Sequence, residues 1–314
     1  MRIIDLKTGT EANRINRPLC LFLGNFDGVH TGHTALGERA KSEGRRNMLA
    51  VGAWSFEKHP MDYIGEAYVP KLTSVDEKCS LFAKMGIDYM ICEDFTRVKD
   101  YSPEEFVSRV LVSELDCKIA VCGFNFRFGK NGLGDADRLK KLMENEGRTS
   151  ITLPPVSVNG VTVSSSEIRF LLEEGRTDEA NRLLGRPYSL TAEVVHGKSI
   201  GRELGFPTAN QLFPREKVRL KNGIYAVICV IDGVEYDGVA NVGCRPTVNE
   251  DENDVNCETH IIGYRGELYG KNLEVRFLKR LRGEMRFSSI DELKSQIEKD
   301  VEEARVFLAS IRAR

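Results

Sequence analysis

The fold of the first half of the chain is decided by the stretch Leu19-Cys-Leu-Phe-Leu-Gly24-Asn-Phe-Asp-Gly-Val-His30-Thr-Gly-His33. Its first five residues are all apolar, which is typical of a strand buried on both faces of a parallel sheet. Glycines then mark a tight turn, and a helical pattern over Thr34–Glu43 follows, with Gly44 as its expected stop. A buried strand, a turn and a helix in succession predict one unit of a parallel sheet that is wrapped by helices.

Similar apolar runs follow along the chain and predict further buried strands at Met48–Trp54, Tyr89–Cys92 and Lys118–Gly123. Between the last two runs, Ser102-Pro-Glu-Glu105 combines a helix cap, a proline at the first helical position and a capping-box glutamate. We therefore expect an N-terminal Rossmann-like α/β domain with a parallel sheet. Ligands in such folds bind at the carboxyl ends of the strands.

Two short helices are expected at the end of this half, one capped by Ser164–Glu167 and one over Thr177–Leu184. The stretch Gly185-Arg-Pro187 then interrupts the helical pattern. We place the domain boundary there, which gives a first domain over residues 1–185 and a second over residues 186–314.

The second domain has the pattern of an antiparallel sheet. Asp232-Gly233 is a strong two-residue hairpin signal between apolar runs at Ile224–Ile231 and Val234–Val242. A second turn is expected at residues 270–272, between Leu268-Tyr269 and Leu273–Leu281. Ser289 caps a closing amphipathic helix with apolar residues at helical spacing. These signals predict an antiparallel β-barrel domain with a closing helix.

Composition limits the class of protein. The 314 residues suit two domains, and the net charge of −2 argues against a protein that coats nucleic acid or an anionic membrane. The N-terminus lacks the apolar core of a signal peptide, and no apolar run is long enough to span a membrane. Eight cysteines without a CxxC pair indicate buried thiols in a reducing compartment rather than a zinc site. We therefore expect a cytoplasmic protein.

The turn after the first strand has the chemistry of a phosphate site. Its glycines allow the backbone to approach phosphates closely, and two histidines flank a glycine at the helix start. Both imidazoles could stabilise charge that develops on a transferred phosphoryl group. The alternative is a tight turn with two solvated histidines. The candidate ATP-binding residues here are Gly24, Asn25, Phe26, Asp27 and Gly28, and the candidate catalytic residues are His30 and His33.

This stretch resembles the HxGH motif of the nucleotidyltransferase superfamily. The longer string from Gly24 to His33 resembles the bacterial bifunctional riboflavin kinase/FAD synthetases. Three later segments are similar to that family in the same order. They are residues 56–60 with His59, residues 123–129 with Asn125, Phe126, Arg127 and Phe128, and residues 164–169 with Ser164, Ser165, Ser166 and Arg169.

The resemblance implies roles for these segments. It assigns residues 123–129 to the flavin, and His59, the serines and Arg169 to ATP. The implied reaction is attack by the phosphate of FMN on the α-phosphorus of ATP, with Mg²⁺ assisting, to give FAD and pyrophosphate. Read alone, the serine run is also explained as a helix cap; one helix N-terminus can serve both purposes.

A second constellation lies in the second domain, which has no Walker loop. The stretch Gly197-Lys-Ser-Ile-Gly-Arg-Glu-Leu-Gly-Phe-Pro-Thr-Ala-Asn210 ends in Gly205-Phe-Pro-Thr-Ala-Asn210, which resembles the riboflavin kinase signature. Gly197, Lys198, Gly201 and Gly205 are the candidate phosphate loop. Thr208 and Asn210 offer two oxygens suited to Mg²⁺. The glycines alone would also fit a flexible loop between strands.

Downstream, Glu258 and His260 are expected on one face of a strand. The resemblance places a catalytic glutamate at Glu258, which would take the proton from the riboflavin hydroxyl. A surface glutamate is the alternative. The segment with Arg282 and Glu284 resembles the family's flavin-contact segment, although Gly283 replaces the usual proline.

The resemblance covers residues 15–310. It implies an enzyme that phosphorylates riboflavin to FMN and adenylates FMN to FAD, with Mg²⁺ and ATP and without a tightly bound prosthetic group. Partners are expected to be small molecules, not nucleic acid or membrane; the oligomeric state is left open, including a weak homo-oligomer. The alternatives are an enzyme with one inactive half, a pantetheine- or glycerol-type cytidylyltransferase fused to a binding barrel, and a flavin-sensing regulator that binds nucleic acid.

Overall fold

The computed structural model describes residues 1–5, 15–56, 63, 68–197, 201, 204–244 and 255–313. The chain divides into two compact units, Met1–Ser165 and Ser166–Arg314. Each unit has its own sheet. None of the helices in the described ranges is both long and apolar enough to span a membrane.

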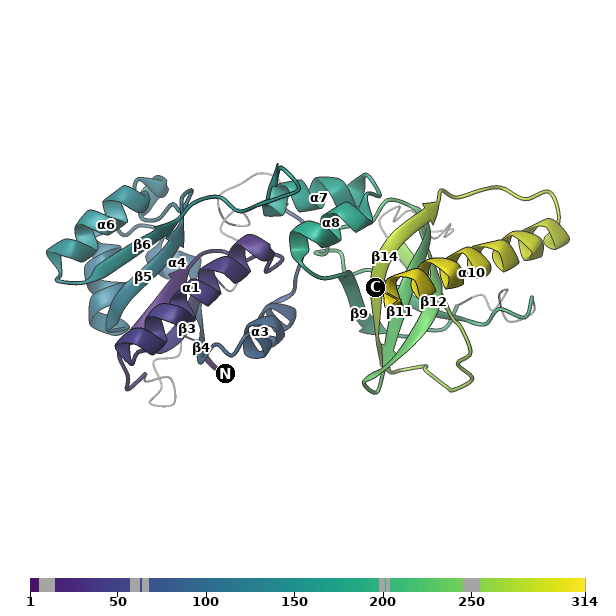
Figure 1. The fold of residues 1–314 in the computed structure, drawn as a ribbon, viewed down its shortest axis with the longest axis horizontal. Coiled ribbons are helices and arrows are strands. Elements are labelled where there is room, and N and C mark those ends of the chain that lie inside the picture. The colour runs from purple at the N-terminus through teal and green to yellow at the C-terminus, as the bar shows by residue number, and fades with distance from the viewer. Residues whose placement is uncertain are drawn as a thin grey trace. The chain divides into compact units, whose positions relative to one another are not determined.

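The first unit contains a six-stranded parallel sheet (Figure 1). Its strand order is β1-β4-β3-β2-β5-β6, so the order reverses between β2 and β5. The four predicted strands are confirmed as β2, β3, β4 and β5, whereas β1 and β6 at the two edges were not predicted. The strands span Arg2–Asp5 (β1), Leu19–Leu23 (β2), Ala50–Phe56 (β3), Tyr89–Glu93 (β4), Cys117–Gly123 (β5) and Thr149–Leu153 (β6).

Strand β2 is buried on both faces of the sheet, which explains its five consecutive apolar residues. Leu19, Leu21 and Leu23 join a core on one face of the sheet, while Cys20 and Phe22 join a second core on the other face. Helices α1 and α3 contribute to the second core, and η2 and α6 to the first. The helices of this unit are α1 (Thr31–Asn47), α3 (Val75–Lys84), α4 (Phe95–Val98), α5 (Pro103–Glu105), η2 (Phe106–Glu114), η3 (Lys130–Gly132) and α6 (Ala136–Asn145).

One predicted helix end is wrong and one predicted start is confirmed. Helix α1 does not stop at Gly44 but runs to Asn47, and Met48 ends it in the left-handed conformation. A Cβ at Gly44 would lie 2.5 Å from a Val51 methyl, so this glycine serves the close approach of helix to strand. At the start of α5, Ser102 forms the expected capping box with Glu105.

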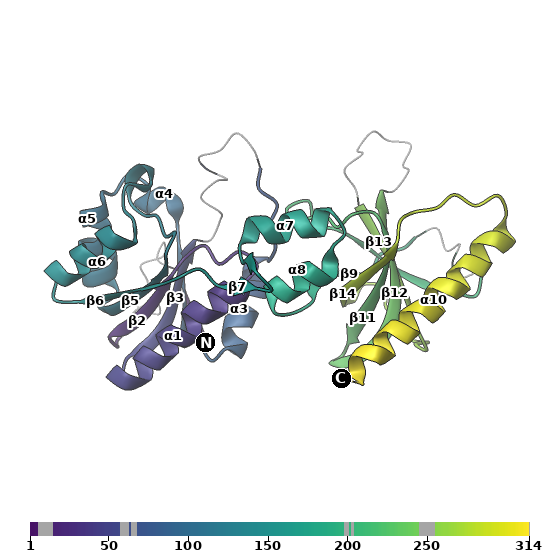
Figure 2. The same cartoon turned by 45° about the horizontal axis from the view of Figure 1, so that its top comes forward.

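The second unit is built on a curved antiparallel sheet in the order β10-β13-β12-β11-β14-β9 (Figure 2). Its edge strands meet, because Val195 bridges to Asn210 and the buried Gln211 amide donates to the Ala192 carbonyl at 2.8 Å. The Asp232-Gly233 hairpin is confirmed between β11 and β12. The strands span Tyr188–Glu193 (β9), Thr208–Leu212 (β10), Gly223–Ile231 (β11), Val234–Cys244 (β12), Val255–Ile261 (β13) and Asn272–Arg282 (β14).

The predicted hairpin at residues 270–272 is not formed. Residues 268–269 are not a strand, and β14 pairs instead with β11 and β9. The turn still exists, but its Gly270 N–H donates to the carbonyl of Val194 beyond the end of β9. Residues 268–269 are thereby left to line a cavity.

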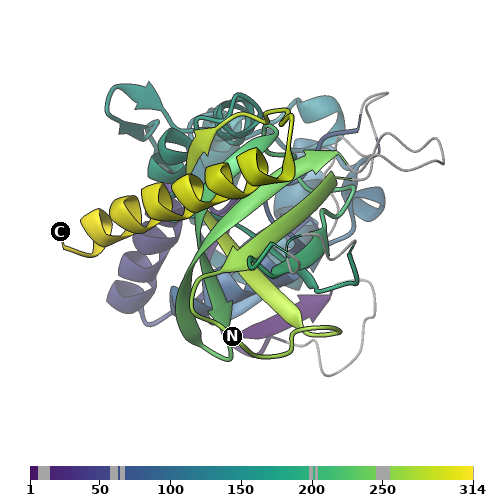
Figure 3. The ribbon, with the colours of Figure 1, turned by 90° about the vertical axis from the view of Figure 1, so that its right-hand side faces the viewer.

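The closing helix α10 (Ile290–Arg312) lies across the outer face of this sheet (Figure 3). Ser289 caps it as expected, and Val301, Ala304 and Leu308 pack on residues of β11 and β12. Ile290 at its first turn is exposed, although the apolar pattern included it. The helix therefore covers the sheet with its middle and C-terminal turns.

The cysteines behave as small buried hydrophobes. All seven whose side chains are described are buried and have free thiols. Burial raises the pKa of the Cys122 thiol to about 11, so it is neutral at physiological pH. The side chain of Cys244 lies outside the description.

Helices α7 (Ser165–Glu173) and α8 (Thr177–Leu184) bear on the domain boundary. The Asn181 amide on α8 donates to the Phe277 carbonyl at 2.8 Å and accepts from the Tyr188 N–H at 2.7 Å. It therefore binds the edge strand β9 and its neighbour β14. The sheet of the second unit thus has hydrogen bonds to residues that precede the predicted boundary at 185/186.

We expect a fragment of residues 166–314 to melt at least about 5 °C above a fragment of residues 186–314, although both fold. The shorter fragment loses the Asn181 hydrogen bonds and the apolar contacts of both helices, and about 1 kcal/mol moves the melting temperature of such a domain by roughly 2–4 °C. Thermal unfolding followed by circular dichroism measures this. Asn181→Ala in the longer fragment should reproduce part of this loss, because it removes the same hydrogen bonds. Equal melting temperatures would support the boundary at 185/186.

Candidate active sites

The turn that follows β2 is strained. Phe26 and Val29 have positive φ angles of 52° and 39°, which non-glycine residues rarely adopt. Such strain persists only where the surroundings enforce it, and it concentrates at functional sites. Here the buried Phe26 ring packs against Phe22 and Phe82, and a Cβ at Gly24 would lie 2.7 Å from this ring. Any phosphate contact by Phe26 must therefore come from its backbone.

The same turn is anchored to residues 72–73. The buried Asp27 carboxylate accepts hydrogen bonds from the N–H groups of Leu72 at 2.9 Å and Thr73 at 3.2 Å. The Thr73 hydroxyl accepts from the Gly28 N–H at 3.0 Å. These contacts fix the path of the turn toward the start of α1. The Asp27 side chain thus has a structural task whatever its contact with ATP.

Sequence reasoning missed Lys78, a buried lysine on α3. Its ammonium donates to the Asn25 carbonyl at 2.9 Å and lies 3.3 Å from the Ser55 hydroxyl at the end of β3. Burial lowers the pKa of the Lys78 ammonium, and the nearby Asp27 carboxylate opposes this shift. Lys78 therefore ties the turn to β3. The one sequence signal was its spacing of four residues from the buried Phe82, which places both on one helix face.

His30 and His33 lie together at the N-terminus of α1. Their rings stack with centroids 3.5 Å apart, and the ring of Phe26 meets His33 edge-on. The His33 N–H donates to Nδ1 of His30 at 3.3 Å, which makes His30 the cap of the helix and puts the proton of its neutral ring on Nε2. No acidic residue lies in the first turn of α1, so its dipole favours an anion here.

The predicted flavin segment lies at the neighbouring strand. Strands β2 and β5 are parallel neighbours, so the residues after each lie at the same carboxyl edge, where the strand order reverses. In α/β sheets this is the place where ligands bind. Asn125 and Arg127 are exposed there, Phe126 is half-buried, and the Phe128 ring is buried against Phe106.

The serine segment reaches the same turn. The Ser165 hydroxyl donates to the Asp27 carbonyl at 2.9 Å. Ser164 is half-buried, Ser166 is exposed, and Arg169 is the fifth residue of α7, one turn beyond the helix start. His59 lies outside the described residues.

The second site is a polar row on the sheet of the second unit. The strand register places Glu258 of β13 directly between Asn210 of β10 and Asn241 of β12. Paired residues of neighbouring strands point to the same face. Within the described part of the chain, the buried Oδ1 of Asn241 has no hydrogen-bond partner. His260, two residues after Glu258, contacts the Pro207 carbonyl through Nδ1 at 3.0 Å.

The glycines of the predicted phosphate loop lie against the two predicted metal ligands. A Cβ at Gly197 would lie 2.5 Å from the amide of Asn210, and a Cβ at Gly201 would lie 3.5 Å from the hydroxyl of Thr208. Gly205 adopts a φ of 88°. Gly197 and Gly201 thus lie against Asn210 and Thr208, while Lys198 lies outside the described residues.

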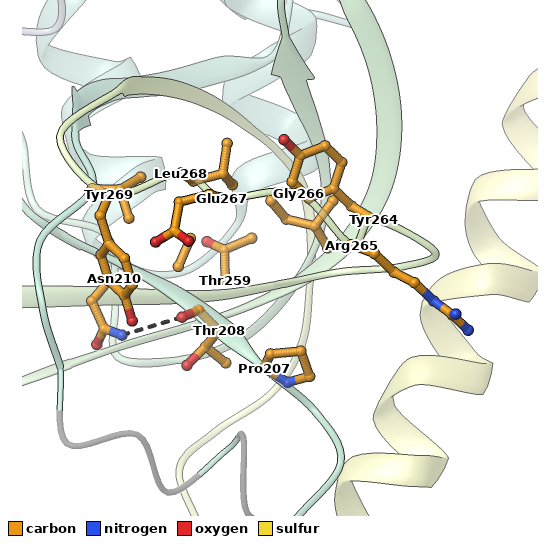
Figure 4. Close-up of a pocket in the computed structure, with 13 residues that line it drawn as sticks. Pro207, Thr208, Asn210, Thr259, Tyr264, Arg265, Gly266, Glu267, Leu268 and Tyr269 are labelled. Atoms are coloured by element: carbon orange, nitrogen blue, oxygen red, sulfur yellow. Dashed lines mark hydrogen bonds between the residues drawn. The ribbon is translucent and has the colours of Figure 1, made fainter.

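A cavity of about 420 Å³ opens beside these ligands (Figure 4). Its volume falls in the range of small-molecule sites. One wall of the cavity comes from residues 264–269, between β13 and β14, and was not predicted from the sequence. In this wall the Tyr269 ring stacks on the His196 ring, with centroids 3.9 Å apart. The cavity is lined by Thr208, Asn210, Thr259, Tyr264, Glu267 and Tyr269, among others.

Arg282 and Glu284 occupy different surroundings. Arg282 forms a two-bond ion pair with the buried Asp300 of α10, with N–O distances of 2.8 and 2.6 Å, and so fastens the closing helix. The Glu284 carboxylate accepts from the Asn222 amide at 3.2 Å and lies over Gly243 on β12. Gly243 is two residues from Asn241, so Glu284 lies near one end of the polar row.

A parallel α/β unit with a phosphate-type turn, joined to a barrel with a polar row beside a cavity, defines a class of two-domain nucleotide-using enzymes. Comparison with known proteins specifies that class. Residues 12–167 match the family model of FAD synthetase, and residues 184–308 match that of riboflavin kinase.

Relatives named bifunctional riboflavin kinase/FMN adenylyltransferase match nearly the whole chain. That of Pseudomonas fluorescens is 37% identical over 292 residues (91% of this chain, 92% of the relative). That of Listeria monocytogenes is 33% identical over 308 residues (97% and 96%). A solved structure described as a macrolide-efflux protein from Streptococcus pneumoniae is 28% identical with a TM-score of 0.85 (96% and 98%).

The chain therefore belongs to the bifunctional riboflavin kinase/FMN adenylyltransferase family. It is an enzyme of flavin cofactor biosynthesis with kinase and nucleotidyltransferase activities. Enzymes of both classes generally use a divalent metal ion with ATP.

Proposed function

We propose that the second unit phosphorylates riboflavin to FMN and that the first unit adenylates FMN to FAD, both with ATP and Mg²⁺. The observation that carries this proposal is the polar row on the barrel. It puts a carboxylate, Glu258, next to Asn210, and Asn210 shares a cavity wall with Thr208. A base, two oxygen ligands and a cavity are what transfer of a phosphoryl group to an alcohol requires.

In the kinase step, Glu258 takes the proton from the 5′-hydroxyl of riboflavin as that oxygen attacks the γ-phosphorus of ATP, and ADP leaves. Thr208 and Asn210 fit Mg²⁺ because they present neutral oxygens two residues apart on β10, and the phosphates of ATP complete the charge balance. The described residues contain no group of three or more His, Cys, Asp or Glu side chains that could hold a metal ion by themselves. When bound, the ion neutralises charge on the phosphates.

In the adenylation step, the turn after β2 and the N-terminus of α1 bind the phosphates of ATP. His30 and His33 donate hydrogen bonds to the oxygens of the α-phosphate as charge builds up on them. Residues 123–129, at the end of the adjacent strand β5, hold the flavin. No covalent intermediate with the protein is needed, because the phosphate of FMN is itself the nucleophile.

The substrates are small molecules, and we propose the cytoplasm as the compartment, where riboflavin and ATP meet. Arg282 stays a proposed flavin contact, in addition to its ion pair with Asp300.

Incubation with riboflavin, ATP and Mg²⁺ should yield FMN first and FAD later, as measured by chromatography. A chelator should stop both steps and excess Mg²⁺ should restore them, whereas Ca²⁺ at the same concentration should restore little, because it accepts looser coordination than phosphoryl transfer needs. Riboflavin that binds but stays unchanged would instead support the flavin-sensing regulator.

A further inference from the structure

A residue not yet assigned any role joins the two halves of the proposed kinase machinery. Asn256 lies on β13, two residues before Glu258, and its side chain is 8% exposed. Its Nδ2 donates to Oε1 of Glu258 at 2.9 Å and lies 3.3 Å from Oδ1 of Asn210. One amide thus contacts both the proposed base and a proposed Mg²⁺ ligand.

The chemistry of the amide fixes its orientation. Carboxylate and amide oxygens accept hydrogen bonds, so the NH₂ side of Asn256 must face them, and its two N–H groups match the two acceptors. The reverse orientation would bring three oxygens together. The 2.9 Å bond involves a charged acceptor and is the stronger of the two.

Asn256 is the main hydrogen-bond donor to both the Glu258 carboxylate and the Asn210 oxygen. Among the residues that the structure describes, Asn256 is the one side-chain or backbone donor that hydrogen-bonds to the Glu258 carboxylate. The Asn210 amide makes a long 3.4 Å contact through its own Nδ2 to the Thr208 carbonyl, which leaves its oxygen to be oriented by Asn256.

We propose that Asn256 is a positioning residue of the kinase site, which holds the Glu258 carboxylate and the Asn210 oxygen at a fixed separation. This rests on the proposed roles of Glu258 and Asn210. The base and the metal ligand act on the two ends of one transferred phosphoryl group, so their separation must match the substrates. Partners that orient ligands in this way typically contribute about 10- to 100-fold to activity or metal affinity.

The test is a double-mutant cycle at saturating Mg²⁺. Asn256→Leu, which keeps the side-chain shape and removes both N–H groups, should lower kcat for FMN formation by about 10- to 100-fold. It should leave the KM for riboflavin within about twofold and leave FAD formation from supplied FMN unchanged. In a Glu258→Gln background the same substitution should lower kcat by less than about twofold, since the group it positions is gone.

An equal loss in both backgrounds would mean that Asn256 acts through general stability, and would overturn the proposal. If Glu258→Gln itself leaves FMN formation intact, the proposed base is wrong, which is a separate failure. A Mg²⁺ titration of Asn256→Leu should show a several-fold higher half-saturation. A wild-type value would overturn the link to Asn210.

Folding is controlled by two further variants. Asn272→Leu makes the same change at an exposed position of β14 and should leave kinase activity unchanged. Asn256→Ser, which is small and polar, replaces the leucine variant if that variant unfolds, and it should show the same loss because its hydroxyl is too short to bridge both acceptors. Normal activity in a folded Asn256→Ser would contradict the proposal.

Discussion

Glu258→Gln is expected to lower the rate of FMN formation by about 10²–10⁴-fold while FMN supplied to the same protein is still converted to FAD at the normal rate. Glutamine keeps the size of the side chain and the hydrogen bond from Asn256 can persist to its oxygen. What is lost is the ability to accept a proton. Because His30, His33 and residues 123–129, which we propose for adenylation, lie in the other unit, the second activity is an internal measure of folding.

The matched control is Glu274→Gln, which removes a carboxylate paired with Arg276 on β14 of the same sheet. This pair is half-buried at the surface of the sheet, where ion pairs contribute little, so the kinase rate of Glu274→Gln should stay within about twofold. Both rates are measured by chromatography of the flavin products. A kinase rate of Glu258→Gln within about threefold of normal would show that another group, or water, takes the proton.

Local signals were enough to predict most of the architecture. The apolar run of β2 is buried on both faces, and the hairpin signal Asp232-Gly233 needs only its own φ angles of 50° and 80°. The turn between β2 and α1 could likewise be read from contiguous residues. These features depend on neighbours in sequence, which a pattern can contain.

Features that depend on packing between distant segments were missed. Glycine is a residue type that often ends helices, but Gly44 lies inside α1. Its small size is needed because Val51 of β3 packs closely against it. Residues 268–269 have the sequence of a strand that would pair with β14. They do not form one, because β14 pairs with β11 on one side and with β9 on the other.

The candidate sites show the same division. The motif residues of each site were predicted, but their supports were not. Lys78 contacts Asn25 across 53 positions of sequence, and Asn256 contacts Asn210 across 46. Such contacts follow from sheet register and helix placement, and the residue types involved carry no signal by themselves.

The double variant His30→Ala with His33→Ala is expected to lower FAD formation by at least about 10³-fold, while FMN accumulates from riboflavin at the normal rate. Removal of one preorganised donor to a developing oxyanion typically costs about 10²–10³ in rate. The stacked rings lie at the positive end of α1, whose first turn contains no acidic residue. Chromatography of the products over time gives both rates.

Alanine at position 30 also removes the cap of α1, because Nδ1 of His30 accepts from the His33 N–H. Losing a cap costs about 1 kcal/mol, so some loss of activity could arise from the helix end rather than from the chemistry. His30→Asn separates the two, since asparagine is among the best cap residues but has no imidazole. If the histidines act on the phosphate, His30→Asn should restore the melting temperature and leave FAD formation low. Recovery of FAD formation together with stability would instead make His30 a structural cap, and equal loss of both activities in a folded double variant would contradict the two-site assignment itself.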